Sequence, residues 1–377
     1  MIASILKTKA NMRKRRILNR DVRHTFLHAM RSALFIPSLL LAVGCSGSVA
    51  GNLSPAPYSA GIPHSSATDA KHYLYVGETR GRGYFRVYDL ADLRLIRQYQ
   101  EPWGTNAMAT DPWGDLYITS SDPSYGQLIA FTPGARSILL RVTINFGFAI
   151  AFDPSGNVYV TETFIEEYAA QSTKRLRTIK ARGAVALAVD KSSHLYAAIR
   201  NQGNGEVLVY SPGSKKPSRV ITKGIDVPTA MLLDSSDDIF VANCSPCASS
   251  GGRSSVTEYA PGSSMPSRTI TKGIDNPSAL ALGSHGLLFV SNDPQGARGF
   301  VSVYSSGSKP VGTITNGIDG PDALAVGPNG NLYVGNCRAC TGRNGGNVTV
   351  YSPDGSELLH KIADGFDDLN VIAIGKE

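Results

Sequence analysis

Residues 321–351 read PDALAVGPNGNLYVGNCRACTGRNGGNVTVY and contain most of the unit that decides the fold. Three apolar runs, ALAV, NLYVGN and NVTVY, are separated by stretches rich in Gly, Pro and Asn. Runs of this length are typical of β-strands, and these turn residues connect neighbouring antiparallel strands. The segment therefore predicts a series of short antiparallel strands.

The aromatic strand of this segment recurs seven times. Its central aromatics are 37 to 49 residues apart and are, in order, Tyr75, Tyr117, Tyr159, Tyr196, Phe240, Phe289 and Tyr333. A second strand follows each of them and ends on Tyr88, Phe131, Tyr168, Tyr210, Tyr259, Tyr304 or Tyr351. A period of about 43 residues matches one four-stranded propeller blade. The sequence therefore predicts an all-β, seven-bladed β-propeller of four-stranded antiparallel blades.

We label the strands of one repeat a, b, c and d in chain order. Strand a alternates Ala with larger apolar residues, as in ALAV at 186–189 and 323–326, whereas strands b and c carry the aromatics. Blades converge toward the axis, so only small side chains fit near it, and larger ones fill the wider gaps outside. This gradient places strand a innermost.

The two ends of the repeat region complement each other. The first repeat begins with strand b at Tyr73, and the chain finishes with NVIAI at 370–374, which has the character of strand a. Adding this last strand to the first blade removes two exposed sheet edges. We therefore predict that residues 73–377 form one propeller closed by the C-terminal strand.

The pattern P-x-A-L-A, then G-N-L-Y-V-x-N, then V-x-V-Y, clearest from Pro321 to Tyr351, resembles the NHL-type propellers and the bacterial extracytoplasmic proteins built from such repeats. Propellers of this kind serve as binding scaffolds, lactonases and lyases. The resemblance implies a binding or scaffolding module with an unidentified ligand. The alternative is a metal-dependent hydrolase or lyase, lactonase-like or streptogramin-lyase-like, for which no catalytic residue is assigned.

Residues 1–44 have the composition of a signal peptide. They contain nine Lys and Arg against one acid, Asp21, and end in the apolar run ALFIPSLLLAVG at 33–44. About a dozen apolar residues are too few to span a bilayer, which needs about 20, but suit a secretory signal. Met1, Met12 and Met30 are alternative start positions.

The run from Ala42 to Cys45 resembles a bacterial lipobox, which implies cleavage before Cys45 and lipidation of that cysteine. Plain secretion with cleavage after Ala50 is the alternative. Residues 45–72 are rich in Ser, Gly, Ala and Pro and predict a disordered tether. We expect an envelope protein, anchored to the outer membrane or periplasmic, that meets the membrane through its lipid alone.

Beyond the leader, 28 basic and 29 acidic side chains remain, so the pI of 9.1 belongs to the leader. A nucleic-acid partner would need a basic patch on the folded domain, and the composition gives none. We expect a monomer whose partner is a protein, an envelope glycan or a small molecule.

Blade topology sorts the connections into two faces. The b-to-c and d-to-a connections lie at one end of the ring, which we call the Asp-turn face, and the others lie at the opposite face. The d-to-a turns GIDVP, GIDNP, GIDGP and GFDDL place four carboxylates there, Asp226, Asp275, Asp319 and Asp367. These could attract a cation such as Ca²⁺ or a basic ligand group, and no other cofactor is expected. The favoured alternative is turn chemistry, in which each side chain accepts a hydrogen bond from a nearby backbone amide.

Four cysteines share that face as two C-x-x-C pairs in the two longest b-to-c connections, namely Cys244 with Cys247 and Cys337 with Cys340. An exported protein meets oxidants, which favours one local disulfide in each loop. A zinc site and a redox-active pair are the alternatives.

The histidines give the enzyme interpretation no support. His194 and His285 fall in a-to-b turns and His360 in an outer strand, so none is placed for chemistry in the channel. Glu78 and Glu162 directly follow strand b in blades 1 and 3. We interpret both as solvated loop acids.

Overall fold

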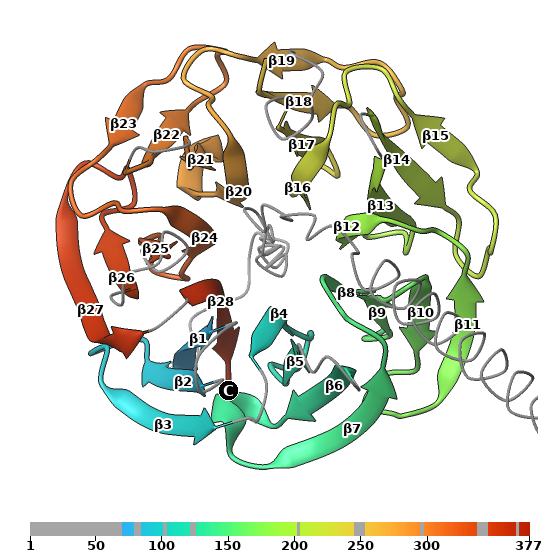
Figure 1. Cartoon of the computed structure of the whole chain (residues 1–377), viewed down its shortest axis with the longest axis horizontal. Helices are drawn as coiled ribbons and strands as arrows, with labels where there is room; N and C mark the ends of the chain where they lie inside the picture. The colour runs from blue at the N-terminus through green and yellow to red at the C-terminus, as the bar shows by residue number, and fades with distance from the viewer. Residues whose placement is uncertain are drawn as a thin grey trace, which may run out of the picture. The chain divides into compact units, whose positions relative to one another are not determined.

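The computed structural model describes residues 70–78, 84–100, 104–120, 126–201, 204–244, 253–294, 298–337, 346–366 and 369–377. These residues form seven four-stranded antiparallel sheets arranged in a ring (Figure 1). The predicted seven-bladed propeller is thus confirmed. Among the described residues, no helix has the length and apolar character needed to cross a membrane. Cys45, Cys247, Cys340 and Asp367 lie outside the described residues.

The strands follow the predicted order in every blade. The innermost strands of blades 1 to 7 are β28 (Leu369–Lys376), β4 (Thr105–Thr110), β8 (Ile150–Phe152), β12 (Ala184–Val189), β16 (Pro228–Leu233), β20 (Pro277–Leu282) and β24 (Pro321–Val326). Strands b are β1 (His72–Glu78), β5 (Leu116–Ser120), β9 (Val158–Thr161), β13 (Leu195–Asn201), β17 (Ile239–Asn243), β21 (Leu288–Asn292) and β25 (Leu332–Asn336).

The two outer strands complete each blade. Strands c are β2 (Tyr84–Asp89), β6 (Gly126–Phe131), β10 (Ile165–Tyr168), β14 (Asn204–Tyr210), β18 (Ser255–Tyr259), β22 (Phe300–Tyr304) and β26 (Gly346–Tyr351). Strands d are β3 (Leu95–Gln100), β7 (Ile138–Ile144), β11 (Arg175–Ile179), β15 (Arg219–Ile221), β19 (Arg268–Ile270), β23 (Gly312–Ile314) and β27 (Leu358–Phe366).

Blade 1 is built from both ends of the propeller, in the order β28-β1-β2-β3. Strand β28 pairs antiparallel with β1, with Leu74 opposite Ile374 and Val76 opposite Ile372. The closure by the C-terminal strand is therefore confirmed. The last residue, Glu377, accepts a hydrogen bond from the Tyr73 hydroxyl at 2.7 Å and pairs with Arg136 of blade 2 at 2.6 Å.

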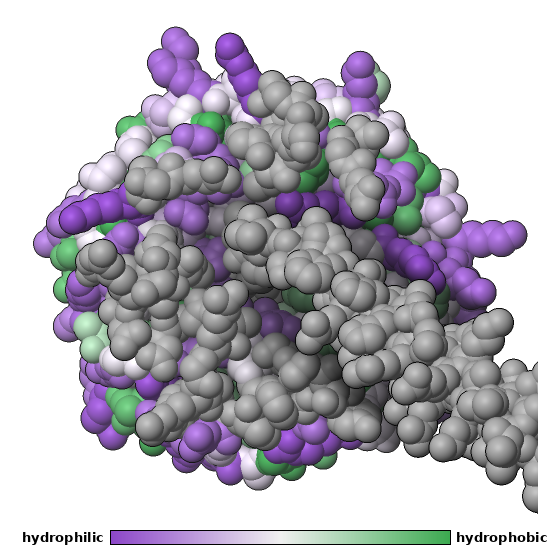
Figure 2. Space-filling view, in the orientation of Figure 1, coloured by the Kyte–Doolittle hydropathy of each residue, from purple (hydrophilic) through white to green (hydrophobic). Residues whose placement is uncertain are grey.

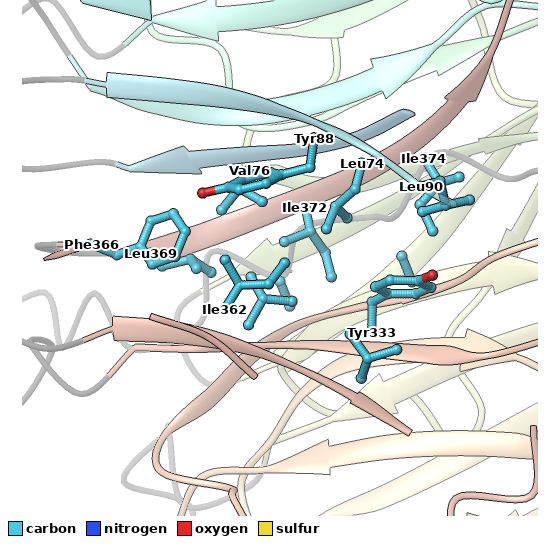
Figure 3. Packing of buried hydrophobic residues seen from close by; sticks show 14 residues of the cluster. Leu74, Val76, Tyr88, Leu90, Tyr333, Ile362, Phe366, Leu369, Ile372 and Ile374 are labelled. Atoms are coloured by element: carbon cyan, nitrogen blue, oxygen red, sulfur yellow. The ribbon is translucent and has the colours of Figure 1, made fainter. Parts of the chain in front are cut away.

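Among the residues described, the core consists of seven apolar clusters, each of which lies between two neighbouring blades. The cluster at the closure packs blade 1 against blade 7: Leu74 and Ile372 lie on one side, and Tyr333 and Ile362 on the other (Figure 3). The alanines of strand a, such as Ala323, fill the narrow inner part of these interfaces. Burial of apolar surface between blades thus holds the ring together.

Because the ring closes through buried side chains, truncating one of them should lower the stability of the protein strongly. Ile372 of β28 is fully buried, so Ile372→Ala should lower the free energy of unfolding by about 2–5 kcal/mol, the usual range for a buried Ile or Leu cut to Ala. Urea denaturation followed by circular dichroism measures this. Leu359 of β27 is the matched control, because it is 42% exposed and Leu359→Ala should cost less than about 1 kcal/mol. Equal losses in the two variants would contradict the closure.

Candidate functional site

Three buried asparagines hold the d-to-a turns on the Asp-turn face. They are the last residues of strands β17, β21 and β25, namely Asn243, Asn292 and Asn336. In each, the side-chain oxygen accepts a hydrogen bond from the backbone N–H of the residue 17 positions earlier, at Asp226, Asp275 and Asp319 respectively, at 2.8 to 3.0 Å. In each of blades 5, 6 and 7, one side chain therefore fixes the turn backbone.

The amide nitrogens of the same asparagines donate both to strand c and to their own strand b. Asn336 Nδ2 donates to Thr349 Oγ1 at 3.0 Å and to the Val334 oxygen at 3.3 Å. Asn243 Nδ2 likewise donates to Thr257 Oγ1 at 3.2 Å. A buried amide has both donors and acceptors to satisfy. Asn meets this need here, because its oxygen faces the turn and its nitrogen faces the sheet.

In blade 3, Glu162 takes the place of the asparagine oxygen that accepts the hydrogen bond from the d-to-a connection. Its Oε2 accepts a hydrogen bond from the backbone N–H of Asn145 at 2.8 Å, again 17 residues earlier. Burial raises the pKa of the Glu162 carboxyl. Glu78 is buried in β1 and forms an ion pair with Arg86 of β2. The interpretation as a solvated loop acid is therefore wrong for Glu78, whereas Glu162 does lie in the b-to-c loop and is half-buried there.

The Asp226 and Asp275 carboxylates take no part in these turn contacts. Asp275 is exposed, and Asp226 and Asp319 are half-buried. Among the described residues, the Asp226 and Asp275 carboxylates form no hydrogen bond or ion pair. The expectation that these side chains accept bonds from nearby backbone amides is wrong for both, since the turn uses their backbone N–H instead. Both carboxylates therefore stay available to a partner.

Asp293 adds a carboxylate that the sequence analysis did not single out. It follows Asn292 directly, and its N–H donates to the Asn276 oxygen at 3.0 Å. Burial, together with the negative charge of Asp319, raises the pKa of Asp293. Asp293, in the b-to-c connection of blade 6, and Asp319, in the turn from blade 6 to blade 7, thus share the Asp-turn face. The sequence offered one signal for Asp293, namely its position directly after the asparagine that ends strand b.

Cys244 and Cys337 occupy that same position in blades 5 and 7. Both are buried, and their N–H groups donate to the oxygens of Val227 at 3.0 Å and Gly320 at 2.7 Å. Their expected partners, Cys247 and Cys340, fall outside the described residues. The two disulfides therefore stay predictions.

Within the described ranges, no three His, Cys, Asp or Glu side chains meet in a way that could hold a metal ion. A hollow of about 400 Å³ lies between the outer strands of blades 6 and 7, lined in part by Val311, Ile314, Tyr351 and Leu358. It contains none of the predicted site residues.

In the view of Figure 2, hydrophilic residues predominate on the coloured surface and hydrophobic ones are scattered. The hydrolase or lyase interpretation stays an untested expectation.

Comparison with known proteins supports the fold. No protein-family model and no curated protein matches the chain. A functionally unknown protein from Desulfotomaculum acetoxidans DSM 771 is similar in structure, with a TM-score of 0.62 and 12% identity over 80% of this chain and 98% of that one. Kuenenia stuttgartiensis hydrazine synthase is also similar, with a TM-score of 0.54 and 11% identity over 68% of this chain and 86% of that one. At these identities the likeness shows the β-propeller fold alone.

The buried asparagines predict a site-specific loss of stability. Asn292→Ala leaves the Asp275 N–H and the groups bonded to the Asn292 amide without partners, which should cost about 2–3 kcal/mol. Chemical denaturation measures the change. Asn316→Ala is the control, because Asn316 is exposed and offers its backbone oxygen, not its side chain, to Tyr351. A cost below about 0.5 kcal/mol for Asn292→Ala would show that the asparagine does not hold the turn.

Proposed function

We propose that the protein is an exported, lipid-anchored propeller of the NHL type that binds its partner on the Asp-turn face. One observation carries this proposal. Asp226, Asp275 and Asp319 sit at equivalent places in successive turns, each on backbone fixed by a buried asparagine. The turns need the backbone of these residues, and at Asp226 and Asp275 they leave the carboxylate unused. Repeated acidic groups on a rigid frame suit recognition of a ligand.

The chemistry of this face favours a partner with basic groups. Asp226, Asp275 and Asp319 lie in the turns that join blades 4 to 5, 5 to 6 and 6 to 7, and Asp293 directly follows strand b of blade 6. Carboxylates on neighbouring blades raise the local concentration of cations and attract Lys and Arg side chains. A protein segment rich in Lys or Arg, or an amino-bearing glycan, fits this requirement.

Binding of a basic probe tests the proposal. We expect a fluorescein-labelled peptide of eight lysines to bind the purified protein in fluorescence anisotropy. Replacing Asp226, Asp275 and Asp319 together by Asn should weaken this binding about tenfold, because it removes the charges and keeps the turn backbone.

The control changes the net charge equally on the opposite face. Asp92, Asp237 and Asp354 lie in a-to-b or c-to-d turns, so their joint replacement by Asn should change the affinity by less than about twofold. Equal weakening by the two triple variants would mean that only net charge matters, and would reject the Asp-turn face as the binding surface.

The lipid anchor is tested separately. The proposal rests on the Ala42–Cys45 segment and on the tether of residues 45–72. A double-acylated N-terminal cysteine would hold the protein stably on a membrane. We expect palmitate label to enter the wild-type protein and not Cys45→Ala, which should be found in the soluble fraction. Unlabelled wild-type protein would support plain secretion instead.

A further inference from the structure

The opposite face has its own repeated turn. The a-to-b turns of blades 2 to 5 are each built around one aspartate, namely Asp111, Asp153, Asp190 and Asp234. In each, Oδ1 accepts hydrogen bonds from the N–H groups two and four residues later, at 2.7 to 2.9 Å. The second carboxylate oxygen, Oδ2, is thereby left for a further partner.

Blades 3 and 4 supply that partner from the residue four positions later. In blade 3, Asn157 Nδ2 donates to Asp153 Oδ2 at 2.8 Å. In blade 4, His194 Nδ1 lies 3.0 Å from Asp190 Oδ2, and the Tyr196 hydroxyl donates to the same oxygen at 3.1 Å. Both buried carboxylates are therefore stabilised within their own blade.

Blades 2 and 5 depart from this arrangement, because the residue four positions later is a second acid, Asp115 or Asp238. The two acids of blade 2 are buried, whereas those of blade 5 are half-buried. Asp111 is 5% exposed, and its Oδ2 has no hydrogen-bond partner in the part of the chain that the structure describes. The Tyr117 hydroxyl is buried beside the backbone of Gln171, whose N–H partly offsets the rise that burial causes in its pKa, and it forms no hydrogen bond of ordinary geometry with any described residue. Asp115 is also buried, and its Oδ2 accepts a hydrogen bond from Gln171 Nε2 at 2.7 Å.

Asp115 and Tyr117 hold the places from which His194 and Tyr196 reach Asp190 Oδ2 in blade 4. The register of the turn therefore places both side chains beside Asp111. Burial, followed by the charge of Asp115, raises the pKa of Asp111 to about 6. Burial also raises the pKa of the Tyr117 hydroxyl, with further contributions from the charges of Asp111 and Asp115. Two buried carboxylates in one place repel each other unless a proton or a cation lies between them.

We propose that Asp111, Asp115 and Tyr117 bind one divalent cation, and that calcium suits the site best. All three side chains offer oxygen, the ligand that calcium prefers, and calcium accepts irregular sets completed by water and backbone oxygens. The two carboxylates balance the charge of the ion. With only two charged ligands, the site resembles the weak calcium sites of extracellular modules, with a Kd of about 10⁻⁴–10⁻³ M.

The surroundings explain what the ion would do. Gly114, between the two acids, has a φ of 91° and packs so closely on the backbone oxygen of Lys376 in β28 that a Cβ would clash. The Trp113 ring likewise packs on Gly156 of blade 3 so closely that a Cβ there would clash with it. The turn therefore touches both neighbouring blades, and a bound ion would stabilise blade 2 against the closing strand.

Thermal unfolding with and without calcium tests this site. We expect 10 mM CaCl₂ to raise the Tm of the purified protein by about 2–4 °C over its value in EDTA. Asp111→Asn keeps the Oδ1 acceptor and removes the charge, so calcium should bind at least tenfold more weakly. Asp115→Asn places in blade 2 the residue type that blade 3 has at Asn157. It should abolish the calcium shift and raise the Tm in EDTA, because the amide can donate to Asp111 Oδ2.

Asp238→Asn is the matched control, because Asp238 holds the same place in the turn of blade 5 and is half-buried. This variant should keep the full calcium shift. The proposal is overturned if calcium does not shift the wild-type Tm, or if Asp115→Asn responds to calcium as the wild type does. Since Asp115→Asn is expected to fold more stably than the wild type, poor folding of Asp111→Asn would not weaken the test.

Discussion

The structure depends on the pairing of β28 with β1. Each blade buries its two faces against its neighbours, so every apolar cluster needs two blades. Without β28, blade 1 would lack its innermost strand, and the cluster that contains Leu369, Ile372 and Ile374 would lose one side. A closed ring has no terminal blade to expose, which is why a short strand at the end of the chain stabilises a domain of about 300 residues.

The architecture could be predicted from the sequence because the residues that recur at the blade period are the ones that the fold buries. Tyr75, Tyr117, Tyr159 and Tyr333 recur at the blade period and are all buried, and Asn370–Ile374 could be recognised as a strand that lacked a partner. Roles within a turn were harder to predict. The interpretation of Asp226 and Asp275 correctly named a turn but chose the wrong group of the residue, since the backbone N–H bonds to an asparagine 17 residues away.

The contacts of Glu78 and Glu162 could not be predicted for the same physical reason. An acid after a strand is usually solvated, and only the neighbouring chain shows that Arg86 or the N–H of Asn145 meets it. The constant spacing of 17 residues between the Asp turns and the asparagines was present in the sequence. Its meaning needed the fold, because it joins two segments across strand a. Turns on both faces are thus fixed in the same way, by buried amides or carboxylates that accept hydrogen bonds from the turn backbone.

Hydrogen exchange of the β1 and β28 amides tests the ring closure most directly. If these strands close the ring, the amides of Leu74, Val76 and Ile372 should exchange only on global unfolding, with the same free energy as amides of the inner strand β24. Exchange of β1 and β28 at a clearly lower free energy than β24 would show that the C-terminal strand opens by itself, and would contradict a ring that is stable only when closed.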